Sequence, residues 1–395
     1  MTSSYRWVVL GLTVVGFMQT HLHRFAFASL IPTFVADLGL SYAAAGTIQT
    51  AYFWTYTLVQ VPIGMMADRW GSRRVMVACM GVLAAGALAF AASRTYVEAI
   101  GARMLVGLGA AAVWVPGMRL VSEWFPPAER GRATGLMSAG GGIGGTLGLV
   151  LVPWLAGFLG WRTAYAALSV PAILTVLLLA VFLRSRGGGA VAHAADGRLG
   201  RVLASRALWP FNVSVCCSFG GYFSFLTFLP AFLVKDMRFT PAEAGFTTSL
   251  ITAGAILSWP LAGVLSDRLG VRKPLVLASQ AVSVLACLAF AWPLPALPPA
   301  AAMVAALATG LLIGGTILPF VMIAELFPHD LAATAAGVAN SACFVGGMVL
   351  PILLGRVVDV TGSFAPAFVV AALVQLAALV AAWFVTETGP RRVTA

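Results

Sequence analysis

Long apolar stretches alternate with short polar gaps along the whole chain, and this alternation limits the folds open to it. A helix needs roughly 20 apolar residues to cross a bilayer. Backbone N–H and C=O groups have no water to bind inside lipid, so each such stretch has to satisfy them internally as a helix. Twelve membrane-spanning helices are predicted on this basis, at 7–35, 44–67, 75–93, 97–122, 132–158, 162–183, 209–234, 243–266, 274–292, 299–324, 332–354 and 364–386.

The composition excludes the soluble alternatives. Of the 395 residues, 60% are hydrophobic and 9% are charged, whereas an average soluble domain has about 25% charged residues. A soluble fold could not hide so much apolar surface, because its own exterior has to stay wet. The five cysteines lie inside apolar stretches without metal-ligand spacing, so we interpret them as packing residues. We therefore expect an all-α integral membrane protein without a metal site.

Positive charge collects in alternate gaps, which predicts the orientation of the chain. The formal net charge is +11, and on a soluble protein this would favour nucleic acid as a partner. If both termini and the even-numbered gaps face the cytoplasm, 16 basic residues lie inside and 5 outside. This positive-inside pattern predicts a multi-pass protein of a bacterial inner membrane, with cytoplasmic termini and no nucleic-acid partner. The inside set is Arg6, Arg69, Arg73, Arg74, Arg130, Arg132, Arg184, Arg186, Arg198, Arg201, Arg206, Arg268, Arg272, Lys273, Arg391 and Arg392, and the outside set is Arg94, Arg162, Lys235, Arg238 and Arg356.

Two gaps that lie half a chain apart share one pattern. Gly64–Arg74 and Gly263–Lys273 both read Gly-x-x-x-Asp-Arg-x-Gly-x-Arg followed by Arg or Lys, at an offset of 199 residues. The run from Glu123 to Pro126 repeats from Glu325 to Pro328 at an offset of 202. Six helices return the chain to the same side of a membrane, so both halves have the same orientation, as in transporters built from parallel repeats.

A polar stretch separates the two halves. Residues 184–206 hold a run of three glycines and five arginines, which is typical of a flexible linker. We predict a six-helix bundle over 1–183, a cytoplasmic linker over 184–208 and a second six-helix bundle over 209–395.

The repeated loop resembles the signature loop of the major facilitator superfamily, and it stands where that family has it, after the second and eighth predicted helices. The resemblance covers the whole chain, with its twelve helices, two halves and central linker. It implies a monomeric secondary transporter rather than an enzyme, which works by alternating access, needs no cofactor and draws on a proton or ion gradient. No phosphate-binding loop or zinc-protease motif occurs in the sequence.

The chemistry of this loop suits a gate. Glycine permits a tight turn between two helices, and Asp68 can face the positive end of a helix dipole. The arginines can pair with acidic groups, and those pairs have to separate when this side of the protein opens. The resemblance implies a gating role for Asp68, Arg69, Arg73, Asp267, Arg268 and Arg272.

Arg24 lies near the middle of the predicted helix 7–35. A guanidinium at that depth is costly unless water or an anion compensates it, and arginine offers a bidentate fork to carboxylate or phosphate. The run from Arg24 to Pro32 is similar to the first helix of the anion:cation symporters and the organophosphate:phosphate antiporters, which implies that Arg24 binds the substrate. The helix 209–234 has no second arginine, which favours a single carboxylate over a doubly charged phosphate. A structural pairing of Arg24 with polar groups of the helix is the alternative.

Two further basic residues are candidates for proton coupling. Histidine changes charge near physiological pH, and His23 stands where the anion:cation symporters often have an acid. We therefore expect His23 to contact the substrate and to carry a proton. Arg103 opens the pattern Arg-x-x-x-Gly-x-Gly, which looks like the fourth-helix motif of the superfamily; the alternative is that Arg103 extends to the outer surface. We interpret His21 as a neutral, hydrogen-bonded histidine.

Polar residues at helical spacing complete the expected cavity, with ordinary helix packing as the alternative for each. Tyr52 and Tyr56 share a face of the predicted helix 44–67, because they are four residues apart. The candidates for lining the cavity are Thr20, Tyr52, Tyr56, Tyr222 and Asn340.

These features together predict uptake of a small organic anion, a carboxylate, by proton symport across the inner membrane. The alternatives are proton-coupled efflux of amphipathic compounds, exchange of organic anions, and a transporter-like sensor of its ligand. Drug and proton antiporters of the superfamily carry a Gly-Pro pair in their fifth helix. Here Gly144-Gly145 stands without that proline, which counts against drug efflux.

Overall fold

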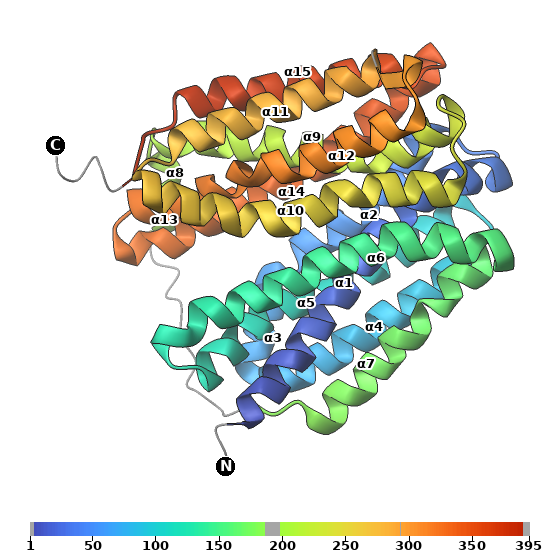
Figure 1. The fold of residues 1–395 in the computed structure, drawn as a ribbon. Helices are drawn as coiled ribbons and strands as arrows, with labels where there is room; N and C mark the ends of the chain where they lie inside the picture. The colour runs from blue at the N-terminus through green and yellow to red at the C-terminus, as the bar shows by residue number, and fades with distance from the viewer. Residues whose placement is uncertain (1–3, 186–197, 293, 390–395) are drawn as a thin grey trace. The chain divides into compact units, whose positions relative to one another are not determined.

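The computed structural model describes residues 4–185, 198–292 and 294–389, and this part of the chain is almost entirely helical, with no strand (Figure 1). The elements are α1 (Tyr5–Leu38), α2 (Tyr42–Leu58), α3 (Gln60–Trp70), α4 (Ser72–Ala92), α5 (Tyr96–Trp124), α6 (Pro127–Ala167), α7 (Ser169–Phe182), α8 (Arg198–Ala204), α9 (Leu208–Lys235), α10 (Pro241–Leu269), α11 (Lys273–Ala291), the 3-10 helix η1 (Leu294–Ala296), α12 (Pro299–Leu312), the 3-10 helix η2 (Ile313–Ile317), α13 (Leu318–Leu326), α14 (His329–Thr361) and α15 (Phe364–Trp383).

The helices are long and apolar, as the sequence predicts. Within the described ranges, nine helical segments have the length and hydropathy to cross a membrane. The 34-residue α1 is not one of the nine, because its polar run from Gln19 to Arg24 lowers its hydropathy. The all-α membrane fold is therefore confirmed.

The structure divides the predicted helix 44–67 into α2 and α3. The break lies at Val59, whose backbone has φ −93° and ψ 0°. Pro62 has no N–H group, so it cannot donate to the carbonyl of Leu58 four residues earlier, and its ring crowds the preceding turn. The proline thus accounts for the break.

The predicted helix 299–324 is also interrupted. Its middle tightens into the 3-10 helix η2, between α12 and α13. Two glycines of η2 lie directly against backbone carbonyls of neighbouring helices: Gly314 faces Ser258, and Gly315 faces Leu275. A side chain at either position would collide with these carbonyls, so the interruption follows from close packing.

Two of the predicted gaps can be compared directly with the structure. Between 158 and 162 the helical path breaks as predicted, because Gly160 within α6 has φ +74° and ψ 156°, which is not helical and which glycine adopts readily. Part of the predicted flexible linker, Arg198–Ala204, forms the short helix α8. Residues 186–197 of that linker lie outside the described residues, as do Arg186, Arg391 and Arg392 of the orientation prediction.

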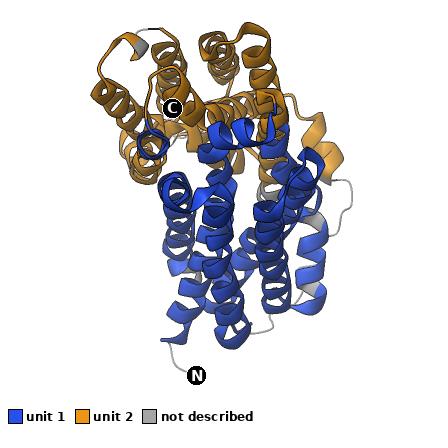
Figure 2. Ribbon diagram, turned by 90° about the vertical axis from the view of Figure 1, so that its right-hand side faces the viewer, with its two compact units in different colours: residues 1–40, 47–192, 240–249 blue, residues 41–46, 193–239, 250–395 orange. Residues whose placement is uncertain are grey.

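The chain forms two compact units (Figure 2). Unit 1 comprises residues 1–40, 47–192 and 240–249, and unit 2 comprises residues 41–46, 193–239 and 250–395. The start of α2 thus belongs to unit 2, and the start of α10 belongs to unit 1.

Glycines on α6 place α1 at the centre of unit 1. Gly140, Gly144 and Gly148 recur every four residues, and their missing side chains let the two backbones meet. An added Cβ at these positions would overlap backbone carbonyls of α1, those of Val14, Met18 and Leu22 respectively. This contact confirms that small residues at four-residue spacing serve close helix approach, and it holds the polar segment of α1 in the interior.

Candidate functional site

The polar segment of α1 is buried inside unit 1. Arg24 is 5% exposed, Thr20 is 1% exposed and His23 is fully buried, whereas His21 is partly exposed. Helices α2, α5 and α6 contribute the residues that enclose this segment. Water is therefore largely excluded from the one guanidinium of α1 that lies in mid-helix.

Aromatic rings surround the Arg24 guanidinium. Its Cζ atom lies 5.2 Å from the ring centroid of Tyr52, 5.6 Å from that of Phe53 and 5.1 Å from that of Tyr56. Nη2 donates a hydrogen bond to the hydroxyl of Tyr52 at 3.3 Å, and the Tyr52 and Tyr56 rings stack at 5.7 Å. Cation–π contacts of this kind stabilise a desolvated guanidinium in part.

Arg24 has no acidic partner among the described residues. Its Nε atom is buried without a hydrogen bond to them. The sequences of α1 and α2 contain a single carboxylate, Asp37 at the end of α1, and Asp37 pairs with Arg162 at 2.6 Å. Arg24 is thus a buried positive charge that only rings and dipoles balance.

A second buried arginine binds the backbone of α1 next to Arg24. Arg103 on α5 is fully buried, so the alternative that it extends to the outer surface is wrong. Its Nη1 donates to the His23 carbonyl at 2.8 Å, and its Nη2 donates to Gln49 Oε1 at 3.1 Å. Gln49 Nε2 in turn donates to the Arg24 carbonyl at 3.2 Å. Arg103 and Gln49 together fix the backbone of α1 at the residue that carries the guanidinium.

The two histidines of α1 lie in different surroundings. Neither ring nitrogen of His23 forms a hydrogen bond with the described residues, and its ring lies 5.9 Å from that of Tyr165. The histidine that contacts Arg24 is His21, whose Nε2 lies 3.3 Å from Arg24 Nη1. Residues three apart share a helix face, whereas adjacent residues do not. That spacing was the signal that could have identified His21 from the sequence.

The remaining predicted lining residues are distributed over both units. Tyr52 and Tyr56 lie at Arg24, and Thr20 donates its hydroxyl to the Phe17 carbonyl at 2.8 Å beside His21. Tyr222 and Asn340 belong to unit 2, where Asn340 is exposed on α14. The structure brings the unit 1 candidates together around Arg24.

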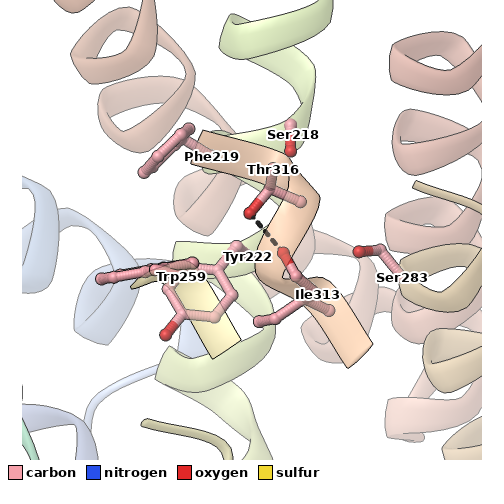
Figure 3. A pocket seen from close by; sticks show the side chains of 7 residues that line it. All are labelled: Ser218, Phe219, Tyr222, Trp259, Ser283, Ile313 and Thr316. Carbon is pink, nitrogen blue, oxygen red and sulfur yellow. Dashed lines mark hydrogen bonds between the residues drawn. The ribbon is translucent and has the colours of Figure 1, made fainter. Parts of the chain in front are cut away.

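Tyr222 lines a small cavity of about 20 Å³ in unit 2, enough for one water molecule. Hydroxyl groups and aromatic rings surround it, and no charged side chain does (Figure 3). The Thr316 hydroxyl turns back to the Ile313 carbonyl at 2.8 Å, and the indole N–H of Trp259 is buried without a partner among the described residues. The lining residues are Ser218, Phe219, Tyr222, Trp259, Ser283, Ile313 and Thr316.

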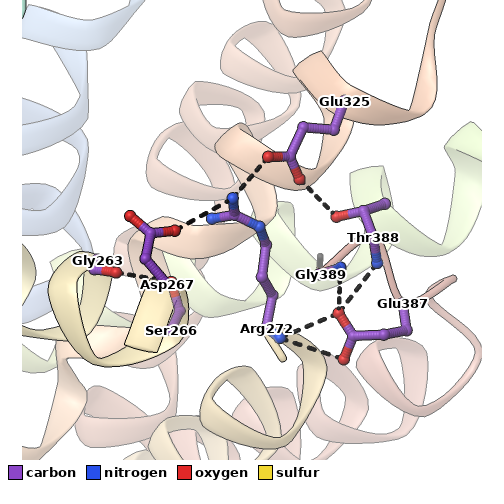
Figure 4. Close-up of polar contacts among 8 residues, drawn as sticks. All are labelled: Gly263, Ser266, Asp267, Arg272, Glu325, Glu387, Thr388 and Gly389. Atoms are coloured by element: carbon purple, nitrogen blue, oxygen red, sulfur yellow. Dashed lines mark hydrogen bonds and ion pairs between the residues drawn. The ribbon is translucent and has the colours of Figure 1, made fainter. Parts of the chain in front are cut away.

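The signature loop of unit 2 is held by acidic groups (Figure 4). Arg272 Nη2 lies 2.6 Å from Glu325 and 3.4 Å from Asp267, and Arg272 is buried. Thr388 donates to the second oxygen of Glu325 at 2.8 Å. Arg268 is exposed, so the predicted gating residues of this loop divide into a paired arginine and a surface arginine.

Glu387 binds the beginning of α11, which sequence reasoning missed. Its carboxylate accepts a hydrogen bond from the backbone N–H group of Arg272 at 3.0 Å (Figure 4). It also accepts one from the backbone N–H group of Lys273 at 2.9 Å. Burial alone would raise the pKa of Glu387, but the N–H groups of Gly389, Arg272, Lys273 and Thr388 hold that pKa below its ordinary value. The carboxylate thus caps a helix N-terminus as an anion.

For the signature loop of unit 1, fewer such contacts are seen among the described side chains. Arg73 is exposed and donates to the Ala180 carbonyl, and Arg69 is exposed. The side chain of Asp68 lies outside the described part of the structure. Glu123, the counterpart of Glu325, pairs with Arg119 at 3.2 Å and accepts from Ser185 at 3.0 Å. Among the described residues, no group of His, Cys, Asp and Glu side chains could hold a metal ion.

Transport proteins of bacteria resemble this chain over nearly its full length. It is 23% identical to the probable galactarate/D-glucarate transporter GudP of Bacillus subtilis, over 95% of this chain and 91% of that protein. It is 26% identical to the probable nitrate/nitrite transporter NarK2 of Mycobacterium tuberculosis, over 88% and 87%, and 25% identical to the probable sulfoacetate transporter SauU of Cupriavidus necator, over 95% and 92%.

Solved structures share the fold. A bacterial homologue of the human lysosomal transporter Spinster superposes with a TM-score of 0.79 at 18% identity, over 98% of this chain and 95% of the other. The nucleoside transporter NupG superposes with a TM-score of 0.83 at 15% identity, over 95% and 99%. The family comparison matches residues 13–240 and 211–395, which together cover almost the whole chain. The protein is therefore a multi-pass membrane transporter that belongs to the Major Facilitator Superfamily.

Proposed function

We propose that this protein carries a small organic anion, a carboxylate, across the bacterial inner membrane by proton symport. The observation that carries the proposal is the Arg24 guanidinium, which is buried, fully charged and without an acidic partner among the described residues. An anion would supply the missing negative charge. A neutral or cationic substrate would leave that charge uncompensated or would add to it.

The groups around Arg24 support a carboxylate. Arginine binds the two oxygens of a carboxylate through parallel N–H groups, and Nη1 and Nη2 of Arg24, which now contact His21 and the Tyr52 hydroxyl, offer such a pair. The Tyr52 hydroxyl, which now accepts from Nη2, can turn its own proton toward a bound oxygen. One guanidinium matches one carboxylate head, and the names of the relatives GudP, SauU and NarK2 all specify anions.

The proposal includes a cytoplasmic gate, which the two signature loops form, and cytoplasmic termini. The two signature loops face the cytoplasm together with both termini, and their ion pairs break and re-form as a monomer alternates between two states. The Arg272–Glu325 ion pair, at 2.6 Å, is the shortest ion pair among the described residues of these loops, so its breakage costs the most when the cytoplasmic side opens. A proton gradient supplies the energy, and no cofactor takes part.

A thermal-unfolding screen tests the proposal on the purified, detergent-solubilised protein. The compounds are D-glucuronate, D-glucarate, sulfoacetate, nitrate, D-glucose and tetraphenylphosphonium. A compound present at one hundred times its dissociation constant stabilises the folded state by about 2.7 kcal/mol. We expect organic anions to raise the melting temperature, and D-glucose and tetraphenylphosphonium to leave it unchanged.

The control variants separate Arg24 from general charge effects. Arg24→Ala should abolish the anion-dependent shift, whereas Arg94→Ala, which removes an exposed arginine of the same unit, should retain it. A shift with tetraphenylphosphonium alone would favour efflux of amphipathic cations and contradict the anion site.

A further inference from the structure

The contact between Arg24 and His21 determines the protonation state of His21. Arginine can only donate hydrogen bonds, so His21 Nε2, at 3.3 Å from Arg24 Nη1, has to be the acceptor. An accepting Nε2 carries no proton, and the ring hydrogen therefore sits on Nδ1. Nδ1 lies 3.2 Å from the Phe17 carbonyl and 3.1 Å from Thr20 Oγ1, both of which can accept it. His21 is neutral in this arrangement.

Among the residues that the structure describes, Arg24 is the charged group in contact with His21. From α6, Gly141 approaches the ring, and an added Cβ there would lie 3.1 Å from His21 Cε1. From α5 the ring of Trp114 packs on Phe17 at 5.0 Å, and Phe17 packs on His21 at 4.4 Å. Tyr52 and Tyr56 of α2 contact Arg24, which in turn contacts His21.

We propose that His21 is the residue that binds the transported proton, and that it does so only when an anion occupies Arg24. This inference rests on the proposed function. A carboxylate that binds Arg24 takes over the Nη1–H group and releases Nε2 of His21. A hydronium ion then gives its proton to the Nε2 lone pair: an N–H bond forms, an O–H bond breaks, and water is left. The new N–H group donates to the bound anion, and release of the anion reverses each step.

The arrangement makes the two binding events depend on each other. Without an anion, a protonated His21 would place a second cation beside Arg24 and would lose its acceptor role. With the anion, the protonated ring adds a charge-assisted hydrogen bond to it. Coupling between two ligands is reciprocal, so a proton on His21 strengthens anion binding to the same degree. One proton and one monovalent anion together carry no net charge.

His21 fits this role better than His23. His21 is partly exposed and its Nε2 lies 3.3 Å from Arg24 Nη1, whereas His23 is fully buried. No hydrogen bond from a described residue to either ring nitrogen of His23 is present, and Arg103 binds its carbonyl rather than its ring. His23 therefore has no direct link to an anion on Arg24.

Calorimetry of anion binding in buffers of different ionisation enthalpy tests the proposal, because it counts the protons taken up. The ligand is whichever of D-glucuronate, D-glucarate, sulfoacetate and nitrate gives the largest thermal shift. We expect wild-type protein to take up about one proton per anion and to lose affinity about tenfold per pH unit at alkaline pH. In His21→Gln, whose amide can still accept from Arg24, proton uptake should vanish while binding persists within about tenfold.

His23→Gln is the matched control and should retain the proton uptake of wild-type protein. Proton uptake that persists in His21→Gln, or that disappears in His23→Gln, would overturn the proposal. If His21→Gln does not fold, the wild-type measurement decides, since anion binding without proton uptake also overturns it. If no anion binds wild-type protein, the proposed function itself fails, and this outcome is distinct from binding without a proton.

Discussion

The two units repeat one loop pattern but differ in their interiors. Unit 1 buries two arginines, Arg24 on α1 and Arg103 on α5. The offsets of the repeated motifs, 199 and 202 residues, place their counterparts between 223 and 226 on α9 and between 302 and 305 on α12, and neither stretch contains a charged residue. Unit 2 instead surrounds its cavity with hydroxyl groups and rings. Among the described residues of the membrane helices, buried arginines therefore occur in unit 1.

The signature loops also differ, and in this case unit 2 has the larger set of described ion pairs. The loop of unit 2 holds Arg272 between two carboxylates, and Glu387 caps the helix that follows. In unit 1, Arg73 is exposed. Among the described side chains, the loop of unit 2 thus has the larger set of ion pairs.

The largest expected effect is a loss of anion affinity, and it should differ between a variant of the unit 1 interior and a variant of the unit 2 interior. Removing the charged partner of a buried, hydrogen-bonded pair costs about 2–5 kcal/mol, so Arg24→Ala should weaken anion binding at least about thirtyfold. Tyr222→Phe removes one neutral hydroxyl of unit 2 and should change affinity less than about tenfold. Calorimetric dissociation constants measure both. Equal losses in the two variants would erase the distinction between the units.

The next largest effect is a loss of folding stability when the packing of α1 on α6 is disturbed. An added methyl group at Gly144 would overlap the Met18 carbonyl, and overpacking typically costs about 1–3 kcal/mol. We expect Gly144→Ala to lower the melting temperature. Gly135 on the same helix has open space around it, so Gly135→Ala should leave stability unchanged or slightly raised. A Gly144→Ala variant as stable as wild type would contradict the close approach of α1 and α6.

The cap on α11 predicts a pH dependence that belongs to unit 2. Because folding lowers the pKa of Glu387, its stabilisation is fully present above the unfolded value of about 4.3. That stabilisation is lost as the pH falls through the lower folded value. Glu387→Gln should cost about 1 kcal/mol at neutral pH, given its partial exposure.

Thermal unfolding between pH 3 and pH 7 provides the test of this cap. The gap between wild type and Glu387→Gln should close as the solution becomes more acidic. A gap that stays constant over this range would show that the carboxylate charge does not carry the stabilisation.

The smallest expected effect concerns a hydrogen bond that has an equivalent in each unit. Ser185 donates to Glu123 in unit 1, and Thr388 donates to Glu325 in unit 2. A single hydrogen bond of this kind contributes about 1 kcal/mol or less, so Ser185→Ala and Thr388→Val should lower stability slightly and equally. A much larger loss for Thr388→Val would extend the contrast between the loops to their shared contact.

Local patterns in the sequence were sufficient to predict the helices and the burial of Arg24. Apolar length predicts the helices, and a guanidinium inside an apolar run indicates a site. The break at Val59 was missed because one proline had to be weighed against a long apolar run. His21 is hydrogen-bonded, as interpreted from the sequence. Its contact with Arg24 was not predicted because the analogy with related symporters pointed to His23, although spacing places His21 and Arg24 on one face. Glu387 gave no local signal, since its partners lie 114 and 115 residues earlier.

Transport by reconstituted protein tests the central claim, that Arg24 binds the transported anion, most directly. Proteoliposomes with an acidic exterior would be supplied with the labelled anion that gives the largest thermal shift. We expect wild-type and Arg94→Ala protein to accumulate the anion, dissipation of the pH gradient to stop accumulation, and Arg24→Ala to show none. Accumulation by folded Arg24→Ala at the wild-type rate would contradict the claim.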